Sequence, residues 1–151
     1  MEKSMNNFKI GIVLLVSFCI SCSKKSEIES TFRTSENEYW KYKNYCLGTK
    51  GIYFQFKEDG SYDKYLLYID EGFSRFNTDM GGGIDRRVWS IKDDSTFVFD
   101  NAEYHIEKIS KEEVLLSYYH YKIKDKKCFI SLKKLVDGPR GPKSLDSVKV
   151  K

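Results

Sequence analysis

The residue types that carry most enzyme and metal chemistry are few in this chain of 151 residues. Its two histidines, His105 and His120, fall in different segments, and no Cys-x2-Cys or His-x3-His spacing typical of zinc sites occurs. The chain also lacks a Gly-x-Ser-x-Gly motif, which marks the nucleophile of many hydrolases. We therefore predict no metal site, no catalytic residue and no cofactor.

Paired acidic residues suggest glycoside hydrolysis, which needs two carboxylates facing each other across a cleft. All four acidic pairs instead lie where turns are expected, and solvated carboxylates are ordinary at turns. The pairs are Glu58-Asp59, Asp70-Glu71, Asp93-Asp94 and Glu112-Glu113. We interpret them as turn residues and do not predict an enzyme.

Short strands must position the remaining side chains. Between Glu38 and Leu135, apolar and polar residues alternate with the period of two that marks half-buried strands. Aromatic residues make up 15% of the chain, which favours strands over helices for burying surface. The eight predicted strands are 38–47, 51–57, 61–69, 86–91, 95–100, 102–109, 113–122 and 127–135.

Consecutive antiparallel strands bury their unpaired edges best by closing on themselves. We therefore predict an all-β fold, an eight-stranded antiparallel up-and-down meander that closes into a small barrel. Residues 38–135 resemble the lipocalin-like domains of bacterial lipoproteins, through Trp40, the hairpin Phe56–Tyr62, the segment Trp89–Phe97 and the turn Ile109–Leu115. This resemblance implies a calyx for a small apolar ligand.

Alternation assigns one set of residues in each strand to the barrel interior. The expected inward-facing residues are Trp40, Tyr42, Ile52, Phe54, Phe56, Tyr65, Leu67, Ile69, Trp89, Ile91, Phe97, Phe99, Tyr104, Ile106, Val114, Leu116, Tyr118, Cys128, Ile130 and Leu132. A barrel of eight strands is just wide enough to be filled by side chains or to admit one small ligand. Six bulky residues, namely Trp40, Phe54, Phe56, Trp89, Phe97 and Tyr118, therefore either line a ligand cavity or fill it.

Two cysteines test whether the barrel closes. Cys46 lies near the end of the first predicted strand and Cys128 near the start of the last, and a closed barrel makes these ends neighbours. We predict a disulfide between them, which closes about 80 residues and stabilises the fold by about 4 kcal/mol. The alternative is two separate buried thiols.

One long loop joins the third and fourth predicted strands. It contains Gly81, Gly82 and Gly83, followed by Ile-Asp-Arg-Arg instead of the Lys-Ser or Lys-Thr of a phosphate-binding loop. Long loops in compact domains are often lids. We predict a flap over one barrel end, with Phe73 and Phe76 either capping the mouth or packing as ordinary core residues.

The amino-terminal residues carry a targeting signal. Lys3 and Lys9 precede the apolar run 10–20, which is shorter than the 18 or so residues that a membrane-spanning helix needs. The run ends in Ser21-Cys22, which resembles the lipobox of bacterial lipoproteins. This resemblance implies cleavage before Cys22 and fatty acylation, such as palmitate, at Cys22. The alternative is an ordinary cleaved signal in which Cys22 is incidental.

These features divide the chain into four parts. Residues 1–21 form the lipoprotein signal peptide, 22–37 a flexible polar tether, 38–135 the barrel and 136–151 an extended tail that contains both prolines. Two residues of the last hairpin, Tyr119 and Tyr121, are expected to face outward, either as an interface, or covered by the tail, or as ordinary solvent-exposed tyrosines.

We therefore expect an extracytoplasmic lipoprotein of the bacterial cell envelope, on its periplasmic or outer-surface face, that binds a small apolar or amphipathic ligand without catalysis. The alternative is a structural or protein-interaction module of an envelope assembly, with a filled barrel. The net charge of +4 is too evenly spread to predict a nucleic-acid partner. A continuous apolar cavity would favour the first function, and a close-packed interior the second.

Overall fold

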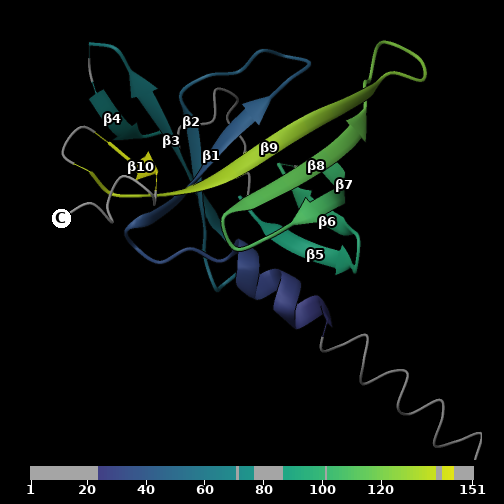
Figure 1. Cartoon of the computed structure of the whole chain (residues 1–151), viewed down its shortest axis with the longest axis horizontal. Coiled ribbons are helices and arrows are strands. Elements are labelled where there is room, and N and C mark those ends of the chain that lie inside the picture. Colours follow the sequence, from purple (N-terminus) through teal and green to yellow (C-terminus); the bar gives the residue numbers. More distant parts are fainter. Residues whose placement is uncertain (1–23, 71, 77–86, 101, 139–140, 145–151) are drawn as a thin grey trace, which may run out of the picture.

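The computed structural model describes residues 24–70, 72–76, 87–100, 102–138 and 141–144. Within these residues the fold is nearly all-β, with one short helix and a curled antiparallel sheet (Figure 1). The strands are β1 (Glu38–Asn44), β2 (Ile52–Phe56), β3 (Tyr62–Tyr68), β4 (Gly72–Arg75), β5 (Trp89–Asp93), β6 (Thr96–Phe99), β7 (Ala102–Ile109), β8 (Glu113–Tyr119), β9 (Lys127–Val136) and β10 (Lys143–Ser144). All eight predicted strands are present, and β4 and β10 are additional.

The sheet follows the predicted meander. Its order is β4-β3-β2-β1-β9-β8-β7-β6-β5, with β10 paired to β9 outside this path. The first and last long strands, β1 and β9, pair from Glu38 opposite Val136 to Asn44 opposite Ile130, as the predicted closure requires. The remaining seam, between β3 and β5, is joined by an isolated bridge between Ser61 and Val88. The result is a half-barrel.

The strand β3 is hydrogen-bonded on one edge both to the residues before β5 and to β4, and this division produces the half-barrel. At its start, the Tyr62 amide donates to the Arg87 carbonyl at 3.1 Å, beside β5. Further along, Tyr65 pairs with Arg75 of β4, so β3 leaves β5 and the seam opens. The buried carboxylate of Asp63 accepts from the Arg75 guanidinium at 2.5 Å and from the Lys57 ammonium at 2.7 Å, which holds β4 in place.

A helix over residues 24–32 packs on one end of the half-barrel (Figure 1). The prediction of a flexible tether over 22–37 is therefore wrong for its described part. Ile28 and Phe32, four residues apart, share one helix face and are buried, with Phe32 fully inaccessible. No helix among the described residues is long and apolar enough to cross a membrane.

The carboxyl end of this helix is bound to the sheet by three hydrogen bonds. The last carbonyls of a helix have no partner within it, so other groups must supply donors. The indole Nε1 of Trp40 donates to the Phe32 carbonyl at 2.7 Å. The ammonium of Lys134 donates to the Thr31 carbonyl at 3.3 Å and to the Arg33 carbonyl at 3.5 Å. The same ammonium lies 4.8 Å from the centre of the Trp40 ring.

The interior is close-packed with aromatic rings. Phe32 stacks on Phe97 with ring centres 4.1 Å apart, and contacts Phe56 edge-on at 6.1 Å. The principal cluster contains Ile28, Phe32, Trp40, Phe54, Phe56, Tyr62, Trp89, Ile91, Phe97, Phe99, Val114, Leu116, Ile130 and Leu132. Five of the six proposed cavity residues, namely Trp40, Phe54, Phe56, Trp89 and Phe97, are therefore core, and Tyr118 is half-buried against them.

The predicted inward set is wrong in β3. Phe56 pairs with Tyr62 and Ile52 with Leu66, so Tyr62 and Leu66 face inward in place of Tyr65 and Leu67, and Ile69 is fully exposed. Alternation fails here because the outer face of β3 is also covered. A second cluster of Tyr39, Tyr53, Tyr65, Phe73 and Leu135 lies on that face.

We expect Phe32→Ala to lower the free energy of unfolding by about 3–5 kcal/mol, because it leaves an aromatic-sized cavity at the centre of the core. Denaturant unfolding monitored by tryptophan fluorescence measures this change. The control is Ser26→Ala on the exposed side of the same helix, which should stay within about 0.5 kcal/mol of the parent. Equal effects for the two variants would contradict the packing of Phe32.

Candidate functional site

The end of the half-barrel away from the helix carries a layer of tyrosine side chains. Tyr42 of β1, Tyr104 of β7 and Tyr118 of β8 are half-buried and pack against the main core. The rings of Tyr104 and Tyr118 meet edge-on at 5.8 Å between centres. This layer differs from the helix end, where the packed rings are mainly those of Phe and Trp.

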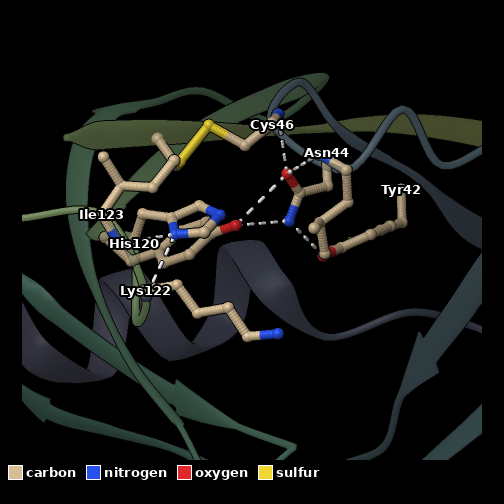
Figure 2. The surroundings of a disulfide bond; sticks show 9 residues. Tyr42, Asn44, Cys46, His120, Lys122 and Ile123 are labelled. Carbon is tan, nitrogen blue, oxygen red and sulfur yellow. Dashed lines mark hydrogen bonds between the residues drawn. A yellow bond between two sulfur atoms is a disulfide. The ribbon is translucent and has the colours of Figure 1, made fainter.

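Asn44 connects this tyrosine layer to the backbone. Its side-chain amide donates to the Tyr118 hydroxyl at 2.9 Å and to the Tyr42 hydroxyl at 3.2 Å. Its carbonyl oxygen accepts from the amide nitrogens of Cys46 at 3.0 Å and Leu47 at 3.1 Å. One buried side chain thus fixes both the tyrosine hydroxyls and the turn that carries Cys46, as Figure 2 shows.

The Cys46–Cys128 disulfide is present, which confirms that prediction (Figure 2). Its Cα atoms are 5.7 Å apart, within the range that a disulfide requires. Cys128 is fully buried and precedes Ile130, the β9 partner of Asn44, on the same face of the strand. The bond therefore covalently closes the meander at the tyrosine end.

Burial sets the protonation of this layer. Burial raises the pKa of Tyr104 above its ordinary value of about 10, and the nearby Tyr42 and Asp100 raise it further. Burial also raises the pKa of Tyr42, although its hydrogen bond to Asn44 acts in the opposite direction. Both hydroxyls therefore stay neutral across the physiological range and act as hydrogen-bonding groups.

A surface pocket of about 530 Å³ lies over β7 and β8, beside this layer. Its lining combines tyrosine rings with polar groups and consists of Thr96, Ala102, Glu103, Tyr104, His105, Ser117, Tyr118, Tyr119 and Tyr121. His105 and Ser117 pair across the two strands; His105 is exposed, whereas Ser117 is buried and its hydroxyl donates to the Glu107 carboxylate at 2.6 Å. The volume falls in the range of roughly 300–1,000 Å³ that is typical of small-molecule sites. The lining suits a ligand with both apolar and polar parts.

The predicted lid residues lie elsewhere. Phe73 stacks on Tyr65 at 5.2 Å and packs with Tyr39 and Tyr53 on the outer face of the sheet, so its assignment as a cap over the barrel mouth is wrong. Phe76 is half-buried beside Lys64, whose ammonium lies 5.9 Å from its ring centre. The glycines at 81–83 and the lipidation candidate Cys22 fall outside the described residues.

The two histidines lie in different surroundings. His105 is exposed on the outer face of β7. The imidazole Nδ1 of His120 accepts two backbone amides, from Lys122 at 3.1 Å and Ile123 at 3.2 Å. Among the described residues, no group of three or more His, Cys, Asp and Glu side chains is placed to hold a metal ion.

The roles of two central residues, Phe32 and Asn44, are not predicted from the sequence. Phe32 falls in the predicted tether, although its four-residue spacing from Ile28 is the signal of a helix with one apolar face. Asn44 carries no signal, because its role depends on two hydroxyls that only the folded sheet brings near it. Comparisons of the chain with protein-family models, curated proteins and solved structures find no match.

We expect protein isolated from its host without reductant to show no alkylatable thiol at Cys46 or Cys128 until it is reduced. Mass spectrometry of peptides alkylated with and without reductant measures this directly. Replacing both cysteines by serine should lower the free energy of unfolding by about 4 kcal/mol, because the unfolded chain loses a long covalent loop. Two free thiols in unreduced protein from its own host would contradict the disulfide.

We expect the buried tyrosines to ionise late in an alkaline titration. The folded state holds the neutral form, so stability is full below about pH 10 and falls as the pH rises through the raised pKa values. Absorbance near 295 nm should show a late component in the native protein that shifts to lower pH in urea. Tyr104→Phe should reduce this component, and Tyr119→Phe, at an exposed site, should leave it unchanged.

Proposed function

We propose that this chain is a lipid-anchored lipoprotein of the bacterial cell envelope, attached through Cys22, that binds a small amphipathic ligand without catalysis. The pocket over β7 and β8 carries the proposal, because it combines tyrosine rings with the exposed polar side chains of Glu103 and His105. The lipobox-like Ser21-Cys22 and the preceding apolar run support the anchor. The disulfide supports an oxidising, extracytoplasmic location.

The proposed ligand contact differs from that of an open calyx. Phe32 and its neighbours occupy the interior, so a ligand at this site contacts the outer face of the sheet and the tyrosine layer. The hydroxyl of Tyr104, which burial keeps neutral, suits a hydrogen bond to an uncharged polar group. The tyrosine rings suit the apolar part of the same molecule.

A second candidate function is a structural or protein-interaction module of an envelope assembly. The filled interior favours it, because a barrel packed with aromatic rings gives a rigid platform. Tyr119 and Tyr121, with 72% and 77% of their surfaces exposed, are typical of residues that contribute to interfaces.

Native mass spectrometry of protein purified from the membranes of its own host tests both functions. We expect the mass of a chain that begins at an acylated Cys22, plus a discrete adduct from a retained ligand. His105→Trp should lower ligand occupancy about tenfold or more, because the larger indole occupies space in the pocket that the ligand needs.

The matched control is Lys108→Trp, at an exposed position of the same strand that does not line the pocket. An adduct that survives His105→Trp would overturn the proposed site. A reproducible protein partner without any adduct would favour the second function. An unprocessed amino terminus at Met1 would overturn the anchor.

A further inference from the structure

The hairpin that joins β8 to β9 projects beyond the body of the sheet (Figure 1). We call residues 119–129 of this hairpin the hairpin tip. Three of its apolar or aromatic side chains are strongly exposed: Tyr119 at 72%, Tyr121 at 77% and Ile123 at 48%. Exposed side chains of this size, gathered on a projecting element, mark an interaction site more often than a neutral surface.

The hairpin tip is held in shape by its own bonds. The imidazole of His120 accepts the amides of Lys122 and Ile123, and the His120 amide donates to the Lys126 carbonyl at 2.9 Å. Cys128 ties its base to β1 through the disulfide, and His120, Lys122 and Ile123 lie in the surroundings of that bond (Figure 2). The backbone that carries the exposed side chains is therefore fixed by hydrogen bonds and by the disulfide.

Basic residues surround these apolar side chains. The hairpin tip contains Lys122, Lys124, Lys126 and Lys127, all exposed, against a single acidic residue, Asp125. The ammonium of Lys122 lies 5.3 Å from the centre of the Tyr121 ring, and that of Lys127 lies 5.6 Å from the Phe129 ring. Lys127 also pairs with Glu107 of β7.

We propose that the hairpin tip docks on a lipid surface that carries anionic headgroups. Tyrosine is enriched at the membrane–water interface, where its ring reaches apolar material and its hydroxyl stays hydrated. Lysine stems lie along apolar surface while their ammonium groups reach the headgroups. Each lysine near an anionic bilayer raises affinity about fivefold.

The shape of the hairpin tip favours a lipid surface over an acidic peptide. A protein partner binds most strongly where side chains fill pockets that exclude water. Ile123, with 48% of its surface exposed, belongs to the hairpin that projects beyond the sheet, and a projecting element can enter a fluid surface without a complementary pocket. Binding to an acidic protein is therefore the outcome that the test must separate.

The hairpin tip and the helix that follows the proposed anchor lie at opposite ends of the half-barrel, the hairpin at the upper end and the helix at the lower end of the view (Figure 1). The orientation of the docked protein rests on the proposed lipid anchor, but docking itself needs only the hairpin tip. A lipid anchor combined with a basic patch gives stable attachment where one signal alone does not.

Tryptophan placed in the hairpin tip tests this contact. We use the full chain carrying Ile123→Trp, with vesicles of brominated phosphatidylglycerol or brominated phosphatidylcholine. The matched control is Ile69→Trp, at a fully exposed isoleucine in the β3–β4 turn. The native Trp40 and Trp89 are buried and contribute the same background to both variants.

We expect phosphatidylglycerol vesicles to quench the indole emission of the Ile123→Trp variant more strongly than that of the Ile69→Trp variant, and phosphatidylcholine vesicles to show no such difference. Adding Lys122→Glu and Lys124→Glu together should weaken this tip-specific quenching about 25-fold or more in apparent affinity. Equal quenching in the two variants would overturn the proposal. Equal quenching by the two lipids, or no effect of the lysine changes, would overturn it as well.

Failure here is distinguishable from failure of the proposed function. The retained adduct and its loss in His105→Trp report on the pocket, and neither depends on added vesicles. Cys22→Ser removes the acylation site but should leave the tip-specific quenching in place. Retention of an acidic protein by the parent chain, together with unquenched emission from the Ile123→Trp variant, would assign the hairpin tip to a protein partner and overturn lipid docking.

Discussion

The docking of the helix over residues 24–32 on the end of the sheet is the constraint from which the rest of the fold follows. Phe32 enters the aromatic interior, and the carbonyls at the end of the helix accept hydrogen bonds from Trp40 and Lys134. Burial lowers the pKa of Lys134, so this cation is held in a partly desolvated site by carbonyls and an indole face. Apolar packing of Phe32 and hydrogen bonds to the last helix carbonyls thus both stabilise the carboxyl end of the helix.

The two ends of the half-barrel have divided roles. At the helix end, packed rings remove water and supply most of the hydrophobic stabilisation. At the other end, Asn44 and the disulfide organise tyrosine hydroxyls that remain partly accessible. The interior is filled, and the pocket and the strongly exposed tyrosines lie instead over β7 and β8 and in the hairpin between β8 and β9.

Alternation and turn residues were enough to predict the strands, the β1–β9 pairing and the disulfide, because each depends on local pattern and on the closing of a meander. The pattern failed in β3, where both faces are covered and Tyr65 is half-buried against the outer cluster. It also missed β4, whose four residues are too few for alternation to register. The pocket over β7 and β8 could not be predicted, because its lining depends on strand register and on how the sheet curls.

The helix also changes how far the domain can stand from a surface that holds Cys22. Only Ser23 separates Cys22 from Lys24, the first described residue of the helix, and two peptide units span about 7 Å at most. Lys24 is in turn paired with Asp94 in the β5–β6 turn at 3.2 Å. A lipid at Cys22 would therefore hold Lys24 within about 7 Å of the attachment point, and the domain would lie close to the bilayer.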